Sequence, residues 1–513
     1  MFALSDLADV GFPTGIVALT LWFGVFRWNS SRNNARHLPL PPGPPRKYFV
    51  GNINQVPTSG YEWLAYDKLA KVYGDLIYFS GLGNSVLSIN SYKVANDLLD
   101  KRGAIYSDRP RLPMVKELFG WAWNLIIMSY SEGFAEHRKL VQQSFQPQIV
   151  TSYRPVVVRE VGVLLKNLMT KPDDFYDHLK SMAGAIIMMI TYGHQVDSME
   201  DEFIQLAEKV RETATTSPGS QLVDLLPILK YTPSWFPGQQ FARHAVYVRS
   251  LSHDMRTRPY QQVQAQMAAG TARSSLTSKL IEEHVTPTDH SKEDLIKNVA
   301  GVIYSAGADT VVTALVHFFL AMMQYPEVQE RARQELYSVV GHNRLPEFHD
   351  RKDLPYVSAL VKELLRWKPI APLGVVHCTA DVDEYQGQYI PKGTSVIPNI
   401  AAMLHDKDVY PCPDNFDPTR FLGDQPSPDP ARAAFGFGRR VCPGRYFADE
   451  SMFLAIACIL HTFHISHPVD TEGRPVDLKI EWSSGLVAVP SYFPCIIQPL
   501  PETRKLVIDA ILD

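Results

Sequence analysis

The chain has 513 residues, 45% of them hydrophobic, and a formal net charge of −4 at pH 7. That much apolar material can bury a large core and excludes general disorder, and the slightly acidic balance lacks the basic footprint of a nucleic-acid-binding protein. The five cysteines are Cys378, Cys412, Cys442, Cys458 and Cys495. Because no two of them form a C-x-x-C pair, zinc-ribbon and thioredoxin-type sites are excluded, and the sparse, odd count favours a reducing compartment.

The N-terminus differs in composition from the rest of the chain. Residues 10–26 form an uncharged, mostly apolar run, which as a helix of roughly 26 Å would be about long enough for a thin bilayer. Acidic residues precede this run and arginines follow it: Asp6, Asp9, Arg27, Arg32 and Arg36. This asymmetry places the remainder of the chain in the cytosol and argues against a cleaved signal peptide, whose positive charges come first. We therefore expect a lumenal segment at 1–9, a transmembrane anchor at 10–28, a basic and proline-rich hinge at 29–47 and one large domain at 48–513.

Short helices and strands are predicted next along the chain. Residues 61–73 and 92–101 are amphipathic at helical spacing, and two β-rich runs, 76–80 and 85–89, lie between them around a Gly-Leu-Gly-Asn turn. Residues 381–398 return to short strands separated by glycines. The sequence therefore predicts a small β-rich region built from both ends of the chain.

Long helical patterns dominate the middle of the chain. They run over residues 132–192, 239–267 and 291–324. The last is the longest: Ser291 with Asp294 resembles a capping-box start, a Tyr-Pro step ends the pattern, and a helix of roughly 50 Å can cross a whole domain. We therefore expect a mainly α-helical protein whose longest helix is largely buried.

The middle of that helix carries the sequence Ala306-Gly307-Ala308-Asp309-Thr310. Glycine costs about 1 kcal/mol relative to alanine within a helix, and aspartate and threonine are poor helix formers. Three such residues together predict a local opening of the helical hydrogen-bond ladder, where a hydroxyl and a carboxylate could hold O₂ and relay protons. The alternative is a helix-packing glycine beside a threonine that bonds back to the preceding turn.

A glycine-rich loop near the C-terminus surrounds one cysteine. Residues 435–449, FGFGRRVCPGRYFAD, place Cys442 between glycines and arginines. Glycines let a backbone approach a flat macrocycle, and backbone N–H groups in such a loop can stabilise a thiolate. Arginines pair well with haem propionates, and a thiolate ligand favours O–O cleavage at haem iron. Cys442 is therefore a candidate haem ligand; the alternative is a buried structural cysteine in a turn.

This loop resembles the haem-binding loop of the cytochrome P-450 family. The family pattern, Phe-x-x-Gly-x-Arg-x-Cys-x-Gly, is matched by Phe435, Gly438, Arg440, Cys442 and Gly444. The flanking sequence is most similar to fungal microsomal members. The resemblance implies that Cys442 is the only protein ligand of the iron and that the other four residues shape the haem site.

The centre of the long helix resembles the oxygen-binding motif of the same family. The resemblance implies that Thr310 and Asp309 deliver protons during O₂ activation. The family usually has threonine or serine at the next position, but this chain has Val311. The details of the proton relay are therefore expected to differ from those of typical members.

Two charged segments resemble the family's structural motifs. Glu363 and Arg366 match the Glu-x-x-Arg motif, and Arg420 in the segment FDPTRF would complete a Glu–Arg–Arg cluster. In isolation the first two residues would be an exposed helical pair that contributes roughly 0.2–0.5 kcal/mol. The resemblance implies instead that the cluster fixes the polypeptide around the haem loop.

A further segment resembles the Trp-x-x-x-Arg element at a helix start. Phe134 replaces the tryptophan, so the usual indole N–H contact to a propionate must be absent. Arg138 would still pair with a propionate, and His137 would assist it. His377 occupies a position where family members often contact a propionate, although a lone histidine is more often structural.

Taken together, these resemblances imply one large, mainly α domain with a small β-rich region, preceded by an N-terminal transmembrane helix. They imply a haem-thiolate monooxygenase that inserts one atom of O₂ into a hydrophobic molecule such as a terpenoid, steroid, polyketide or aromatic compound. Electrons would come from NADPH through a separate reductase, with cytochrome b5 as an optional second donor. The location implied is the endoplasmic reticulum membrane, with a single-pass anchor and a cytosolic catalytic domain.

The cavity is expected to be lined mainly by apolar residues. By resemblance, residues 107–128, 373–376 and 484–487 line it, together with Tyr304, Ser305 and Ala308 of the long helix. Two other functions stay open. One is a haem-thiolate isomerase or dehydratase that needs no reductase, and the other is a non-catalytic haem- or lipid-binding membrane protein. Members of the first class often lose the acid–threonine pair, which this chain retains.

Overall fold

The computed structural model describes residues 34, 36–47, 50–215, 223–224, 226–231, 240–286, 288–470 and 472–501. The expected lumenal segment and transmembrane anchor lie outside these residues. Within the described part, the proline-rich end of the hinge runs beside the first strand, because the N–H of Tyr78 donates to the carbonyl of Pro42 at 2.8 Å. A Cβ at Gly43 would come within 2.2 Å of the carbonyl oxygen of Tyr78, so this close approach requires glycine.

Helices make up most of the described chain, as the sequence predicts. The proline at position 147 and the one at 172 divide the long pattern 132–192 into several helices, because proline favours the start of a helix and cannot continue one. The helices are α2 (Glu62–Tyr73), α3 (Tyr92–Ala95), α4 (Gly103–Tyr106), α5 (Glu132–Ser144), α6 (Pro147–Val150), α7 (Arg154–Thr170), α8 (Phe175–Tyr192), α9 (Glu202–Thr215), α11 (Gln240–Ala268), α12 (Leu276–His284), α13 (Glu293–Gln324), α14 (Pro326–Val340), α15 (Pro355–Trp367), α16 (Ile400–Leu404), α17 (Ala431–Ala434) and α18 (Arg445–Thr462). Shorter helical turns of the site are η2 (Asn96–Lys101), η3 (Pro113–Leu118), η8 (Pro418–Phe421) and η9 (Gly438–Arg440).

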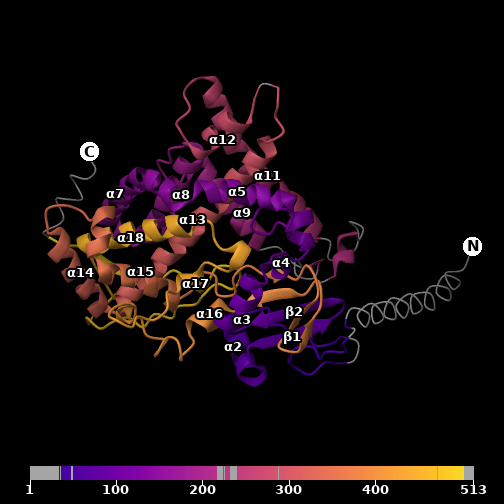
Figure 1. Cartoon of the computed structure of the whole chain (residues 1–513). Helices are drawn as coiled ribbons and strands as arrows, with labels where there is room; N and C mark the ends of the chain where they lie inside the picture. The colour runs from indigo at the N-terminus through magenta and orange to yellow at the C-terminus, as the bar shows by residue number, and fades with distance from the viewer. Residues whose placement is uncertain are drawn as a thin grey trace, which may run out of the picture.

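The longest helix, α13, forms the centre of the core. It contacts α5, α8, α11, α15 and α18, and its C-terminal half, which is mostly apolar, is buried on all sides. A helix that is apolar all round must be buried in protein or lipid. Among the described residues α13 is the only helix long and apolar enough to cross a membrane, but 67% of that stretch is buried inside the protein. In Figure 1 it runs through the middle of the helical part of the molecule.

Two expectations about α13 are wrong. The helix starts at Glu293, with no side-chain cap, because Asp289 already accepts the N–H of Ser291 in the preceding turn; Ser291 and Asp294 form no capping box. The helix is also continuous, with no opening at its centre. The alternative is what the structure shows: the Thr310 hydroxyl donates to the carbonyl of Ala306.

Glycine at position 307 serves close packing rather than an opening. A Cβ there would come within 2.6 Å of the side chain of Ile187 on α8. The helical hydrogen-bond ladder tolerates a threonine that bonds back to it, so neither residue forces the ladder apart.

The strands form the β-rich region predicted from both ends of the chain. Its four-stranded sheet has the order β1-β2-β6-β3, with β2 parallel to β6 and the other pairs antiparallel. In the register, Leu76 lies opposite Ile89, and Val86 lies opposite Ser395. The strands are β1 (Leu76–Gly81), β2 (Asn84–Ile89), β3 (His377–Cys378), β4 (Asp383–Tyr385), β5 (Gln388–Ile390), β6 (Ser395–Pro398), β7 (Phe463–Ser466) and β8 (Ile496–Pro499). Figure 1 shows β1 and β2 beside α2 and α3, away from α13.

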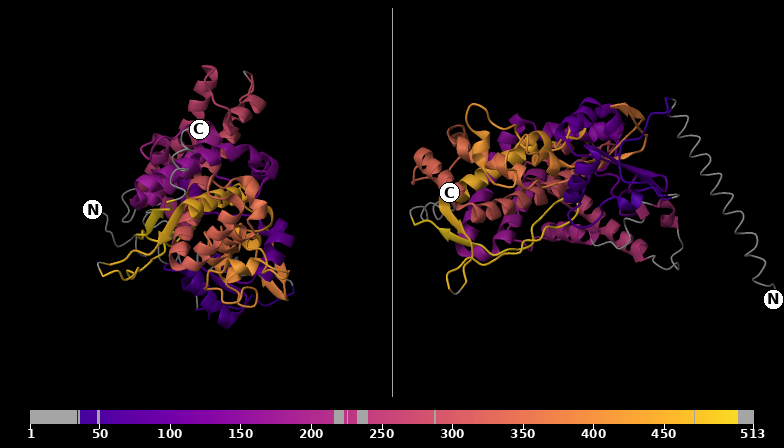
Figure 2. Two further views of the ribbon diagram at one scale, coloured as in Figure 1. Left: turned by 90° about the vertical axis from the view of Figure 1, so that its left-hand side faces the viewer. Right: turned by 90° about the horizontal axis from the view of Figure 1, so that it is seen from below.

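Segments from both halves of the chain interleave. Helix α18 contacts α7 as well as α13 and α15, although α7 and α18 come from opposite halves of the sequence. In both views of Figure 2, orange and yellow C-terminal elements pack among purple helices of the first half. The cysteine loop before α18 is thereby brought opposite the centre of α13.

Candidate active site

The cysteine loop is held tightly against the rest of the protein. Cys442 lies between η9 and α18, and its N–H donates to the carbonyl of Phe435 at 2.8 Å. Gly438 has a φ of +52°, and a Cβ there would come within 2.3 Å of the carbonyl oxygen of Leu99 in η2. Only glycine satisfies both conditions without strain. The loop backbone therefore fixes the position of the sulfur.

The groups around Cys442 shift the pKa of its thiol in opposite directions. Burial raises the pKa of its thiol, whereas the backbone N–H of Gly444 and the positive charges of Arg138 and Arg445 lower it. A bound metal ion outweighs burial, because a coordinating thiol is deprotonated outright. The sulfur is therefore placed to serve as a thiolate ligand once a metal binds.

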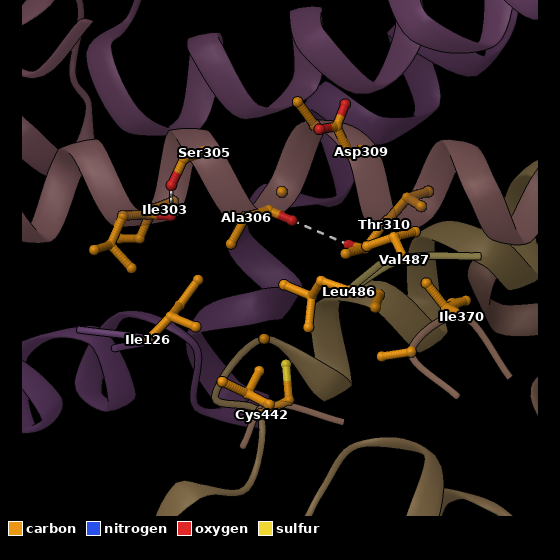
Figure 3. A pocket seen from close by; sticks show the side chains of 18 of the residues that line it. Ile126, Ile303, Ser305, Ala306, Asp309, Thr310, Ile370, Cys442, Leu486 and Val487 are labelled. Carbon is orange, nitrogen blue, oxygen red and sulfur yellow. Dashed lines mark hydrogen bonds between the residues drawn. The ribbon is translucent and has the colours of Figure 1, made fainter. Parts of the chain in front are cut away.

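A cavity of about 510 Å³ separates Cys442 from α13. In Figure 3 the sulfur points across this cavity toward the side of α13 that carries Thr310, with Leu486 between them and Val487 and Ile370 to one side. The walls are mostly apolar. They include Leu125, Ile126, Phe134, Ile187, Ile204, Val302, Ile303, Ala308, Val311, Leu365, Ile370, Ala371, Val375, Phe435, Leu486 and Val487.

Residues from the segments that were expected to line this cavity do line it, and two further helices contribute to its walls. Trp121, Tyr304, Ser305 and Ala308 line it as expected. Trp123 does not line it; its ring lies 3.1 Å from the place of a Cβ on Gly301, so it packs on α13 instead. Helices α8 and α9 also contribute walls, which no motif of the sequence indicated.

One buried arginine and two half-buried arginines surround the cysteine end of the cavity. Arg109, Arg138 and Arg440 all line the cavity, and none of them has a carboxylate within ion-pair distance among the described residues. Burial is the main cause that lowers the pKa of Arg109 to about 9 and that of Arg440 to about 10. Buried cations are costly without counter-ions. The two propionates of a haem would supply that negative charge, so the residues present fit the group.

Backbone carbonyls orient each of these guanidinium groups. Arg440 donates to the carbonyls of Ser107 and Met128, at 2.8 Å each, and Arg138 donates to the carbonyl of Val441 at 2.6 Å. The guanidinium carbon of Arg440 lies 3.7 Å from the ring centre of Phe134. The residue that replaces the family's tryptophan therefore gives Arg440 a cation–π contact in place of an indole hydrogen bond.

Arg109 is a site residue that the sequence motifs missed. It is 6% exposed and donates to the carbonyls of Ile126, Val375 and Val376 at 2.7–2.8 Å. It thus joins two of the segments that line the cavity. The available signal was its position as a basic residue inside the otherwise largely apolar stretch 107–128.

The two candidate histidines lie in different surroundings. His137 does not line the cavity: its Nδ1–H donates to the carbonyl of Gly133 at 2.6 Å, and its Nε2 accepts from Asn298 at 3.0 Å. His377 lines the cavity, and its Nδ1 contacts the carbonyl of Tyr106 at 2.8 Å. Burial, followed by the charge of Arg109, lowers the pKa of His377 to about 3. The structure therefore places His377 on the cavity wall near Arg109 and keeps His137 off that wall; their roles stay predictions.

The charged residues of the Glu-x-x-Arg segment meet in a fully buried cluster. Arg366 donates to both oxygens of Glu363 at 2.7 and 2.8 Å, and Arg420 donates to Glu363 at 3.1 Å. Glu363 also accepts the N–H of Asp417, at 2.8 Å. Arg366 donates further to the carbonyl of Asn415. The cluster thereby ties α15 to η8 and to the loop between them, and the prediction that it stabilises the haem site rests on this geometry.

Asp309 belongs to a second group of charges that sequence reasoning missed. It lies on the side of α13 away from Cys442 (Figure 3). Burial raises the pKa of Asp309, and Glu208 adds to this effect, while Arg211 and Lys180 oppose it. Glu208 accepts hydrogen bonds from Lys180 at 3.3 Å and from Arg211 at 3.0 Å. Lys180, Glu208 and Asp309 are too far apart in the sequence to form a recognisable motif. They come together only because α8 and α9 pack on α13.

Replacing Arg109 with methionine is expected to weaken haem retention. The change removes a buried cation and leaves three carbonyls without their donor, each at a cost of about 1–3 kcal/mol. The haem-to-protein ratio after purification and the thermal unfolding midpoint should both fall. Arg111→Met is the control, because Arg111 is exposed and pairs with Glu117. An Arg109→Met protein with a full haem content would contradict the assignment.

Comparisons with known proteins agree with this geometry. The cytochrome P450 family model matches residues 41–492. The chain is 39% identical to cytochrome P450 monooxygenase COX2 of Coprinopsis cinerea, over 98% of this chain and 97% of the relative. It is 39% identical to cytochrome P450 monooxygenase claR of Ampulloclitocybe clavipes, over 92% and 89%, and 38% identical to cytochrome P450 monooxygenase 208 of Postia placenta, over 100% and 99%. A cysteine loop that faces a long central helix across an apolar cavity, together with the match over residues 41–492 and the full-length relatives, shows that this chain belongs to the cytochrome P450 family of haem-thiolate monooxygenases.

Proposed function

We propose that this protein inserts one oxygen atom from O₂ into a hydrophobic small molecule, with electrons from NADPH delivered by a separate reductase. The observation that carries the proposal is the apolar cavity between the sulfur of Cys442 and the side of α13 that carries Thr310. A cavity of this kind selects ligands by shape and apolar contact, with few polar groups to orient them. Terpenoids, steroids, polyketides and aromatic compounds are the candidate substrate classes.

The chain's own residues prepare the site for this reaction. When bound, haem with a thiolate ligand supplies the capacity to cleave the O–O bond. The loop holds the Cys442 sulfur, and Arg109, Arg138 and Arg440 would neutralise the haem propionates. The apolar wall formed by Ile303, Ile370 and other side chains excludes water from the substrate. Thr310 stands on the cavity side of α13, where its hydroxyl can hold and pass on a proton.

The retained acid–threonine pair supports monooxygenation over isomerisation or dehydration. To test the substrate class, the purified haem protein is titrated with a panel of terpenoids, steroids, polyketides and aromatic compounds. A substrate that enters the cavity changes the haem absorption spectrum. Each compound that does so is then incubated with NADPH and a purified cytochrome P-450 reductase. An oxygenated product that forms only when the haem protein, NADPH and the reductase are all present supports the proposal. A rearranged product that forms without NADPH would show an isomerase or dehydratase instead.

The proposed location is the cytosolic face of the endoplasmic reticulum, held by residues 10–28. The support is the apolar run followed by arginines. Secondary metabolism is the proposed context, and cytochrome b5 is an optional electron donor. Protease protection of a tagged protein in microsomes tests the orientation. A C-terminal tag should be digested in intact vesicles, whereas a protected C-terminal tag would reverse the orientation.

Thr310→Ala is expected to uncouple the reaction. The change removes a hydroxyl and little volume, so folding and haem binding should persist. Positioned proton transfer typically contributes a factor of about 10²–10⁴, so product formed per NADPH oxidised should fall at least tenfold while hydrogen peroxide accumulates. The control is Thr313→Ala, because the Thr313 hydroxyl bonds back to the carbonyl of Asp309 at 2.9 Å but does not line the cavity. Unchanged coupling in Thr310→Ala would place the proton path elsewhere.

A further inference from the structure

A buried histidine follows the Asp309–Thr310 pair on α13. His317 is seven residues after Thr310, so at 3.6 residues per turn the two side chains leave nearly the same face of the helix. Thr310 lines the cavity, whereas His317 does not line it and is 0% exposed. None of the motifs matched above includes His317. A polar side chain buried this completely must be satisfied by protein groups.

Both ring nitrogens of His317 face backbone carbonyls. Nδ1 lies 3.1 Å from the carbonyl oxygen of Lys368, and Nε2 lies 3.0 Å from that of Ala488. The ring of Trp482 packs edge-on against the imidazole, with 5.1 Å between ring centres. Three segments that are far apart in the sequence therefore meet at one side chain.

The two segments that His317 contacts both supply walls of the cavity. Ile370 and Ala371 follow Lys368 closely, and Leu486 and Val487 directly precede Ala488. The N–H of Ala488 also donates to the carbonyl of Ile370 at 2.9 Å. In Figure 3 Leu486 lies between Thr310 and Cys442, with Val487 beside Thr310 and Ile370 to one side of them. A shift of either segment would therefore change the space beside Thr310.

The number of N–H groups on the His317 ring limits how many carbonyls it can bind. Burial is the main cause that lowers the pKa of His317 to about 4, and the nearby charge of Lys368 adds to it. A neutral imidazole has one N–H, whereas two carbonyls face the ring. The ring therefore donates to one segment at a time, and the other segment is held by the Ala488–Ile370 hydrogen bond and by packing.

We propose that His317 is a positioning residue for specificity: together with the Ala488–Ile370 hydrogen bond that joins them, it holds the segments of Ile370 and of Leu486–Val487 against α13 and thereby sets the shape of the cavity beside Thr310. The inference rests on the proposed function, because it concerns how a hydrophobic substrate is placed. It makes His317 neither a haem ligand nor a proton donor to the reaction. The residue acts through the two segments alone.

Two variants of similar side-chain volume separate the effect of the His317 hydrogen bond from the effect of a change in volume. His317→Gln keeps an N–H donor on a flexible chain, and His317→Met has a similar shape without a donor. The probes are imidazole and clotrimazole, which both bind haem iron through a nitrogen and are followed by difference spectra. Imidazole is small enough to reach the iron without contacting the cavity walls, whereas clotrimazole carries three aryl groups that must contact those walls.

The ratio of the two dissociation constants is the decisive readout. A lost buried hydrogen bond is expected to weaken clotrimazole binding by about tenfold in His317→Met, with imidazole changed by less than about threefold. His317→Gln should recover most of the clotrimazole affinity. The matched controls are His461→Met and His461→Gln, because His461 is also 0% exposed and contacts one carbonyl, that of Gly341, but does not line the cavity. Both controls should keep the wild-type ratio.

Several results would overturn the proposal. An unchanged ratio in His317→Met, an equal loss for both probes, or the same change in His461→Met would show that His317 is only a structural histidine. If His317→Met fails to load haem, His317→Asn replaces it, since its shorter amide cannot reach both carbonyls; an unchanged ratio there counts equally against the proposal. Probe binding needs no turnover, so failure of the monooxygenase proposal would leave this test intact.

Discussion

Replacing Cys442 with alanine is expected to abolish the thiolate signature of the haem. The reduced protein with carbon monoxide should lose the red-shifted Soret band that a thiolate ligand produces, and monooxygenation should disappear. The loop geometry gives the reason, because the sulfur is held by a hydrogen bond from the Cys442 N–H to the carbonyl of Phe435 and by close contact of Gly438 with η2. Cys442→His can retain haem, but without the electron donation of a thiolate it should have no activity.

The control for this experiment is Cys458→Ala. Cys458 lies on α18, is 2% exposed and contacts the carbonyl of Pro346, so its loss tests the effect of removing a buried thiol. Its product should bind haem with an unchanged spectrum and a somewhat lower stability. Survival of the thiolate band in Cys442→Ala would refute the assignment of the ligand.

Replacing Glu363 with alanine is expected to produce protein with little haem. Removing one partner of a buried ion pair costs about 3–5 kcal/mol, which is a large part of the net stability of a domain. Here the change leaves two buried guanidinium groups, those of Arg366 and Arg420, without their shared carboxylate. The yield of soluble protein, the haem content and the unfolding midpoint should all fall together.

A control uses a helical ion pair at an exposed site. Lys71 and Asp67 on α2 are four residues apart and form an ion pair, and their side chains are 72% and 40% exposed. Exposed pairs contribute roughly 0–1 kcal/mol, so Asp67→Ala should keep its haem. If Glu363→Ala had full haem content and only an altered product profile, the buried cluster would have no role in forming the site.

The sequence predicted those parts of the site that depend on local pattern. The glycines of the cysteine loop, the hairpin of β1 and β2 and the length of α13 all follow from residues close together in the chain. The comparisons confirm the family to which these patterns pointed. The predicted transmembrane anchor lies outside the described residues and stays a proposal.

The rest of the site depends on contacts between distant segments. Arg109 meets the 375–376 backbone, Glu208 approaches Asp309, and His317 meets Ala488; each pair is set by packing that no periodicity encodes. The expected opening of α13 failed for a related reason. Low helix propensity at Asp309 and Thr310 is a weak local preference, and burial of the helix against α8 overrides it.

The parallel pairing of β2 with β6 has a consequence for synthesis on the ribosome. Ser85 and Thr394, which are joined by a hydrogen bond at this junction, are 309 positions apart in the sequence. At a translation rate of about 5–20 residues per second, roughly 15–60 s pass between their appearance. During that interval the edge of β2 that later binds β6 is open, and open strand edges invite pairing with other chains. Cover for this edge, such as a chaperone, would therefore protect the nascent protein until β6 (Ser395–Pro398) has emerged.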